Sequence, residues 1–219
     1  IKKIFFADNI APLVNNIFSN PMGMESFSII LGSIAFGIQV YCDFSGYSDI
    51  AIGAAAILGF KIPLNFNKPF FATSPSDFWS RWHISLSSWV RDYLYFPLAL
   101  KHRRFSSIAF PSLLLSMVVM GLWHGASWNF VIWGVFHGIF LVVFTILRNK
   151  YSKPTEPFFK SKFGKLISIF VTQYLVFFTF IVFIVQDFDH MWYAMTKYVI
   201  LDFETSQTIE IINANEFAS

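Results

Sequence analysis

The stretch from Ser106 to Leu147, SSIAFPSLLLSMVVMGLWHGASWNFVIWGVFHGIFLVVFTIL, decides the fold of this chain. It contains two apolar runs, 106–122 and 128–147, which a short Gly-Ala-Ser sequence separates. A helix needs roughly 20 apolar residues to cross a bilayer, and both runs approach that length. The pattern predicts a helical hairpin whose two outer ends lie on the same side of a membrane.

The hairpin carries two ionisable residues, His124 and His137. An imidazole inside hydrocarbon is costly unless it has a partner or a function, so this pair is the strongest functional signal in the chain. Gly134 and Gly138 flank His137, and small residues at this spacing favour close packing of helices. We therefore interpret His137 as a packing residue, whereas from the residues alone His124 is equally well explained as a helix-packing histidine or as a functional residue.

Composition predicts an integral membrane protein. Of the 219 residues, 55% are hydrophobic and 20% aromatic, only 13% are charged, and the mean hydropathy is +0.56. A single cysteine, Cys42, excludes an intrachain disulfide and a multi-cysteine metal site, and we expect no metal and no tightly bound cofactor. The net charge of +3 comes from basic blocks beside apolar segments, which indicates membrane topology and no nucleic-acid partner.

The remaining apolar segments complete an all-α, polytopic transmembrane bundle. Residues 27–60 are longer than one crossing requires, which predicts either a break around Asp43 to Asp49 or a strong tilt of the helix. Residues 166–186 form a further span. The basic loops at 61–104 and 148–165 predict cytoplasmic positions, and the acidic tail after Gln186 is expected on the opposite side. We expect one membrane-embedded domain over residues 1–219, with residues 1–26 as an interfacial segment or the end of an earlier helix.

The central segment SPSDFWSRWHISLSSWVRDYLYFPLAL, residues 74–100, predicts an amphipathic or re-entrant helix. Ser76 is the expected cap of this helix. His83 and Ser87, four residues apart, share a face that can point into a protein cavity. Aromatic and small residues recur at three- and four-residue steps as one stripe on another face: Phe78, Trp82, Ser85, Trp89, Tyr93 and Phe96.

Three sequence blocks carry a resemblance to a known family. YCDFSGYSDIAIGAAAILGF (41–60), NFNKPFFATSPSDFWSRWHISLSSWVRDYLYFPL (65–98) and GLWHGASWNFVIWGVFHG (121–138) resemble, in this order, the membrane-bound O-acyltransferases. The similar bacterial branch includes alginate and peptidoglycan O-acetyltransferases and the teichoic-acid D-alanylation protein. The resemblance is strongest over residues 1–148, and it implies that the family's earlier membrane helices precede this piece of chain.

The resemblance also implies a site and a reaction. The histidine of the family's WHG motif falls on His124, and that of its WHxSLS motif falls on His83, so these are the expected catalytic residues. Family members are thought to pass an acyl group from a cytoplasmic thioester, most simply the co-substrate acetyl-CoA, to a hydroxyl of an extracytoplasmic polysaccharide. The resemblance also implies a periplasmic or secreted partner enzyme. It implies that the protein crosses the bacterial inner membrane several times and is surrounded by membrane lipids.

The residues fit that chemistry. A neutral imidazole suits a general base near pH 7 because its ordinary pKa is about 6.5. Neighbouring residues that can donate hydrogen bonds or orient the ring are Trp123, Trp128 and Asn129.

Other interpretations stay open at this point. One alternative is a transporter or channel, because intramembrane Asp and His residues also form ion and proton pathways. Another is a scaffold that only docks a partner, although such a protein would have no need for this pattern of histidines. D-alanyl transfer to teichoic acid is a further alternative. Asp43 and Asp49 can bind a cation, cap a broken helix or, as we favour, pair with basic residues of the central loop. We expect a local salt bridge between Arg91 and Asp92, and solvated side chains at His102 and His190.

Overall fold

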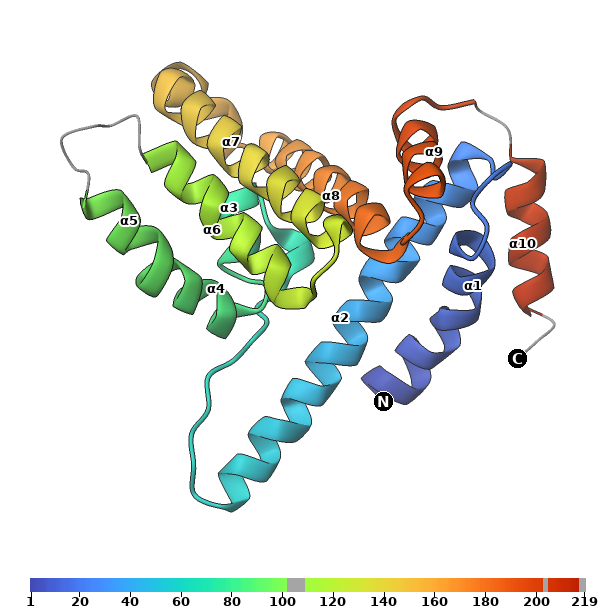
Figure 1. Cartoon of the computed structure of the whole chain (residues 1–219), viewed down its shortest axis with the longest axis horizontal. Coiled ribbons are helices and arrows are strands. Elements are labelled where there is room, and N and C mark those ends of the chain that lie inside the picture. Colours follow the sequence, from blue (N-terminus) through green and yellow to red (C-terminus); the bar gives the residue numbers. More distant parts are fainter. Residues whose placement is uncertain (102–108, 203–204, 217–219) are drawn as a thin grey trace. The chain divides into compact units, whose positions relative to one another are not determined.

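The computed structural model describes residues 1–101, 109–202 and 205–216, and these residues form helices and loops without a strand (Figure 1). Three helices in this part of the chain are long and apolar enough to cross a membrane: α2 (Ser26–Ile57), α7 (Trp128–Lys160, over its portion Trp128–Tyr151) and α8 (Lys162–Ile184). The prediction of an all-α membrane protein is thereby confirmed. His102 lies outside the described residues.

The chain forms two compact units, residues 1–62 with 177–219 and residues 63–176. The boundary falls within α8, whose residues through Val176 belong to the second unit and whose residues from Phe177 belong to the first. The prediction of one membrane domain over residues 1–219 stays a prediction.

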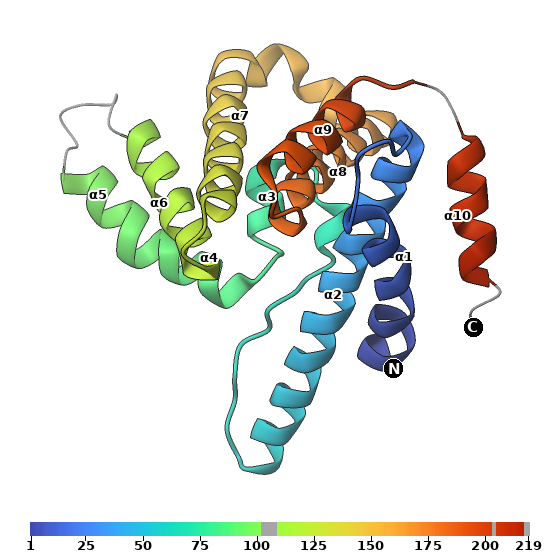
Figure 2. The ribbon, with the colours of Figure 1, turned by 45° about the vertical axis from the view of Figure 1, so that its right-hand side comes forward.

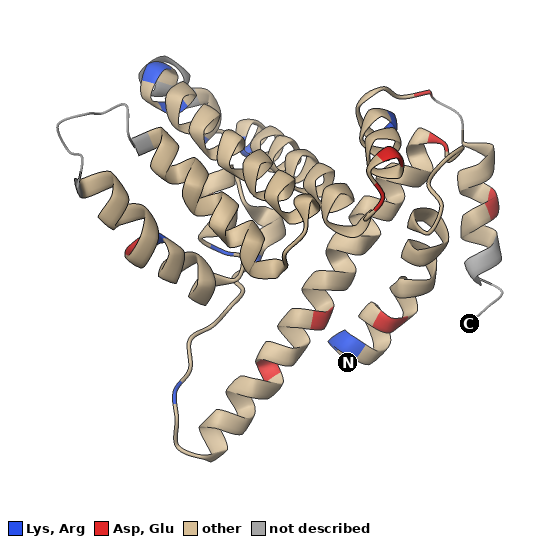
Figure 3. Cartoon of the chain, in the orientation of Figure 1, with Lys and Arg blue, Asp and Glu red and all other residues tan. Residues whose placement is uncertain are grey.

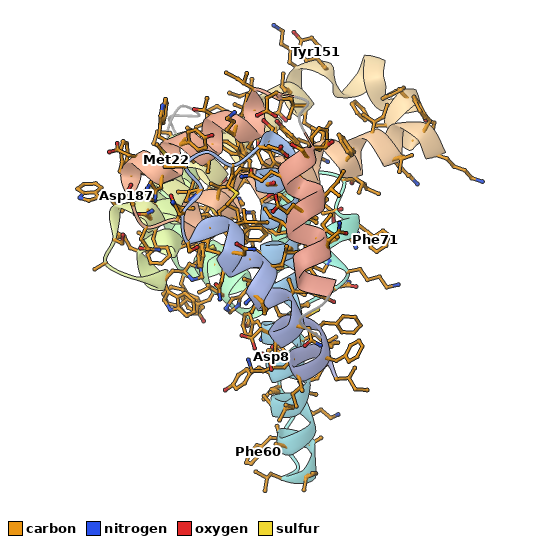
Figure 4. All side chains as sticks on the ribbon, turned by 90° about the vertical axis from the view of Figure 1, so that its right-hand side faces the viewer. Asp8, Met22, Phe60, Phe71, Tyr151 and Asp187 are labelled. Atoms are coloured by element: carbon orange, nitrogen blue, oxygen red, sulfur yellow. The ribbon has the colours of Figure 1, made fainter. Side chains whose placement is uncertain are left out.

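The first unit is built along α2. A π-helix, η1 (Lys2–Ala7), continues into α1 (Asp8–Phe18), and α1 runs beside α2 in both views (Figures 1 and 2). Gly32 allows this approach, because a Cβ there would lie 2.9 Å from side-chain atoms of Ile17 and Phe18. Figure 4 places Phe60 beyond the far end of α2 and Met22 before its start. The last elements of this unit are α9 (Phe188–Val199) and α10 (Ser206–Glu216).

Of the two alternatives for α2, the break was wrong, because the helix runs unbroken through residues 43–49, whereas the strong tilt stays a prediction. Lys3 Nζ donates to Asp43 Oδ1 at 2.6 Å, and Lys2 Nζ donates to Asp49 Oδ2 at 2.7 Å. Acidic positions of α2 and the basic start of the chain lie near one another in Figure 3. Pairing of these carboxylates is confirmed, but the partners come from η1 instead of the central loop. Carboxylates neutralised in this way need no helix break to satisfy them.

The start of α2 and the start of α10 cap each other. The Glu25 carboxylate accepts the backbone N–H of Gln207 at 2.9 Å and that of Thr208 at 3.1 Å. In return, Gln207 Oε1 accepts the Glu25 N–H at 3.0 Å, and the Asp202 carboxylate accepts the Ser26 N–H at 3.3 Å. Burial alone would raise the pKa of Glu25, but the donors around its carboxylate outweigh that effect and lower the pKa.

The second unit begins with an extended segment that leads through η2 (Pro69–Phe71) into four short helices. They are α3 (Pro75–Trp79), α4 (Ile84–Val90), the π-helix η3 (Arg91–Tyr95) and α5 (Phe96–Lys101). One continuous helix was predicted here, and this was wrong, since the chain turns between α3 and α4. The cap also lies two residues earlier than predicted, because Ser74 Oγ and not Ser76 accepts the Asp77 N–H, at 3.1 Å.

This turn divides the predicted aromatic stripe into two groups. Phe78 and Trp82 are buried and stack on one another with ring centroids 5.5 Å apart. Trp89 and Tyr93 also stack, at 5.6 Å, but they are 55% and 70% exposed. The first pair therefore packs inside the unit, and the second pair faces outward. The predicted salt bridge between Arg91 and Asp92 is confirmed at 2.8 Å.

The predicted helical hairpin is confirmed as α6 (Ala109–His124) and α7, which lie side by side in Figures 1 and 2, although α6 is shorter than the helices that could cross a membrane. The placement of both outer ends on one side of a membrane stays a prediction. Glycines set their separation. A Cβ on Gly134 would clash with the Met117 carbonyl oxygen and lie 2.9 Å from Val118 Cα, and a Cβ on Gly121 would clash with the Phe130 carbonyl. The loop predicted at 148–165 was wrong, because α7 continues to Lys160. Its basic residues mark the edge of the apolar stretch and not the end of the helix.

Candidate active site

The second unit brings three histidines into one cluster of rings. His124 is the last residue of α6, where the chain turns through Gly125, whose φ of 159° is nearly extended. His83 lies in the turn before α4, and His137 lies on α7. His83 and His124 are half-buried, whereas His137 is only 2% exposed. The two histidines predicted to be catalytic are thus the two that keep some access to their surroundings.

Trp123 contacts both of the predicted catalytic histidines. Its ring centroid lies 5.7 Å from that of His83 and 5.1 Å from that of His124, with interplanar angles of 85° and 79°. Both imidazoles therefore make edge-to-face contact with one indole. The indole itself is 61% exposed, so the contact forms at the surface of the unit and not in its core. Residues that are 41 positions apart in sequence (124 − 83 = 41) meet here.

A second indole supports His124 from the buried side. The Trp133 ring lies 5.3 Å from His124 and 4.6 Å from His137, and Trp133 is 3% exposed. Trp79 contacts His137 at 5.1 Å, and Phe78 stacks on it at 6.4 Å. His137 is enclosed by aromatic rings between helices, in agreement with its interpretation as a packing residue.

The candidate donors near His124 differ in position. Trp123 contacts the imidazole, whereas Trp128 is 79% exposed. Asn129 is buried, and Ser127 Oγ lies 3.3 Å from its Oδ1. Sequence reasoning missed Trp133 and Trp79. The position of Trp133, one helical turn before His137, was a signal that could have identified the first of them, because residues four apart share a helix face.

The electrostatics around His83 favour an uncharged ring. His83 lies outside the candidate spans, and its burial lowers its pKa below the ordinary value. Among the described residues, no group of three His, Cys, Asp or Glu side chains could hold a metal ion. The arrangement offers two neighbouring imidazoles that can accept a proton, on an apolar aromatic surface.

Several known proteins are similar in sequence to this chain. A model of the membrane-bound O-acyltransferase family matches residues 2–187. Over 150 residues the chain is 46% identical to a probable alginate O-acetylase AlgI of Azotobacter vinelandii, and over 157 residues it is 40% identical to a peptidoglycan O-acetyltransferase of Helicobacter pylori. A teichoic acid D-alanyltransferase of Bacillus subtilis is 31% identical over 190 residues.

These similarities cover most of the chain but less than half of each relative. The aligned residues make up 68%, 72% and 81% of this chain, respectively. They correspond to 29%, 29% and 47% of the three relatives. The cluster around His83 and His124 lies inside the segment that the family model matches.

Proposed function

Because the chain belongs to the membrane-bound O-acyltransferase family, we propose that it forms the histidine-bearing part of an enzyme that transfers an acyl group to a polysaccharide hydroxyl. The observation that carries this proposal is the contact of His83 and His124 with the same indole, that of Trp123. A scaffold protein would have no need to bring two distant, partly accessible imidazoles together. The family's chemistry uses a proton acceptor at such a place.

We assign the role of general base to His124. Its neutral imidazole accepts the proton of the acceptor hydroxyl while the hydroxyl oxygen attacks the thioester carbonyl carbon and forms the new C–O bond. The tetrahedral intermediate then collapses, the C–S bond breaks, and the leaving thiolate takes the proton back from the imidazolium. The base is regenerated, and the products are an ester and a free thiol.

We assign His83 to holding the acceptor hydroxyl beside His124. Low dielectric strengthens hydrogen bonds and favours neutral imidazoles, so the aromatic surroundings suit both roles. Trp123 separates and orients the two rings, and Trp133 fixes His124 from the buried side.

The substrates follow from the relatives. We propose acetyl as the acyl group, because the O-acetyltransferase relatives are 40% and 46% identical and the D-alanyltransferase is 31% identical. Acetyl-CoA on the cytoplasmic side is the proposed donor, and an extracytoplasmic cell-envelope glycan is the proposed acceptor, reached directly or through a periplasmic or secreted partner enzyme. This requires a multi-pass protein of the bacterial inner membrane, surrounded by its lipids.

A transporter or channel is less well supported. That interpretation depended on intramembrane acidic residues, and in the structure Asp43 and Asp49 are each paired with a lysine. Neutralised carboxylates of this kind stabilise a helix contact, and they do not provide a vacant ion-binding site.

The proposal is tested in the full-length protein that contains this chain, purified into lipid nanodiscs and supplied with radiolabelled acetyl-CoA. We expect release of CoA and transfer of label to a glycan acceptor, and we expect His124→Ala to lower turnover by about 100- to 10,000-fold, the usual contribution of a general base. His190→Ala is the control, because His190 lies on α9, a helix that contributes no residue to this cluster. Undiminished turnover in His124→Ala would contradict the proposal.

A further inference from the structure

His83 has an unusual backbone. Its φ of 43° and ψ of 53° place it in the left-handed region, and His83 and Lys68 are the only non-glycine residues with positive φ in the described part of the chain. Side chains with a Cβ are disfavoured there and persist only where surrounding contacts hold the conformation. Since this conformation sets the direction of the imidazole, the contacts that hold it control the position of His83.

Asn65 holds the chain immediately after His83. Its carbonyl oxygen accepts the Ile84 N–H at 2.9 Å. Its side-chain Oδ1 accepts the Ser85 N–H at 3.3 Å and the Ser85 hydroxyl at 2.6 Å. These N–H groups belong to the first turn of α4, where no helical partner exists, so Asn65 caps α4 from 20 residues away (85 − 65 = 20).

Asn67 holds the chain on the other side of His83, but only through its backbone. The Asn67 N–H donates to the Arg81 carbonyl at 2.9 Å, and the Asn67 carbonyl accepts from Arg81 Nη1 at 3.4 Å. Arg81 is itself fixed by Asp77, whose Oδ1 accepts from Arg81 Nε at 2.7 Å. The Asn67 side chain is exposed. The turn is thus held before His83 by main-chain bonds, and after it by the Asn65 main-chain carbonyl together with the Asn65 side-chain amide.

We propose that Asn65 is a positioning residue for the reaction, which acts by holding His83 in its left-handed conformation against Trp123. This inference rests on the proposed function. Without the Asn65 side chain, the Ser85 N–H and hydroxyl lose their acceptor, and only the main-chain bond to the Ile84 N–H remains. His83 then relaxes to an ordinary backbone conformation that carries the imidazole away from the indole. In this role Asn65 acts through the backbone of the turn that carries His83.

A measurement that does not require turnover tests the position of His83. The full-length protein is labelled with ¹³C at histidine Cε1, and the His83 resonance is assigned with His83→Gln. Asn65→Ala is expected to shift the His83 resonance, whereas Asn67→Ala, the matched control, leaves it in place. Asn65→Asp keeps an oxygen acceptor for Ser85 and is expected to restore the position. A His83 resonance that Asn65→Ala leaves unchanged overturns the inference.

Turnover then tests the consequence. Asn65→Ala is expected to lower acyl transfer by about 10- to 100-fold, because displacement of a positioned group by about 1 Å has effects of this size. Asn65→Asp and Asn67→Ala should stay close to the parent protein. Suppose that His83→Gln lowers turnover, whereas Asn65→Ala moves the His83 resonance but leaves turnover unchanged. The positioning role of Asn65 is then overturned, and the proposed function stands. If neither His83→Gln nor His124→Ala lowers turnover, the proposed function has failed instead.

Discussion

Replacement of Gly134 by alanine tests how closely the hairpin must pack to hold the histidines. A Cβ at this position would clash with the Met117 carbonyl oxygen and lie 2.9 Å from Val118 Cα. Both are backbone atoms of α6, so no side chain can move aside, and α6 and α7 must separate. His124 ends α6, and Trp133 immediately precedes Gly134, so the separation also loosens the contact between these two rings.

The magnitude follows from two opposing effects. Alanine is a better helix former than glycine by about 1 kcal/mol, which favours the substitution. Overpacking of a close contact costs about 1–3 kcal/mol, which opposes it. Gly53→Ala is the matched control, because Gly53 lies inside α2 with open space around its Cβ position and shows only the first effect. The expected difference in free energy of unfolding between the two variants is therefore about 1–3 kcal/mol.

The assay is SDS-induced unfolding of the full-length protein in detergent, followed by tryptophan fluorescence, together with acyl transfer in nanodiscs. Gly134→Ala should unfold at lower SDS and transfer acyl groups more slowly than Gly53→Ala. Equal stability and equal turnover of the two variants would refute the reasoning that α6 and α7 meet at this glycine.

Further predictions concern the charged and titratable groups. The pKa of Glu25 is lowered by its hydrogen bonds to α10, so the stability that this carboxylate contributes is present above its ordinary pKa and is lost as the pH falls through the lowered value. Glu25→Gln should therefore expose α10 to limited proteolysis at neutral pH. Unchanged protection of α10 in this variant would contradict the cap. Lys3 and Asp43 are about half exposed, so a double-mutant cycle of Lys3→Gln and Asp43→Asn should give a small favourable coupling that weakens as salt is added, and an unfavourable coupling would argue against the pair. Because burial lowers the pKa of His83, its histidine NMR titration should have a midpoint below pH 6.5, and a midpoint at or above that value would contradict its burial.

Local signals in the sequence predicted the hairpin and its histidines. Long apolar runs on both sides of a Gly-Ala-Ser turn are sufficient to indicate α6 and α7, and the two histidines of this segment stand out against the apolar background. Glycines four apart around His137 indicated close packing, and the structure encloses this residue in aromatic rings. These features depend on residues near one another in the chain.

Features set by distant residues could not be predicted in the same way. The unbroken α2 depends on Lys2 and Lys3, which pair with carboxylates 47 and 40 positions away. The turn at His83 depends on Asn65, because local periodicity alone favoured a single helix with one aromatic stripe. In both cases a tertiary hydrogen bond decides between local conformations that the sequence pattern leaves close in energy.

The most direct test of the proposed chemistry is an experimental map of the full-length protein with a non-hydrolysable acetyl thioester analogue and a glycan acceptor fragment. The account predicts that an acceptor hydroxyl lies about 3 Å from a ring nitrogen of His124, with the carbonyl carbon of the analogue next to that hydroxyl and His83 beside it. An analogue bound with its carbonyl away from His124, while that imidazole is closed off by protein on every side, would contradict the account.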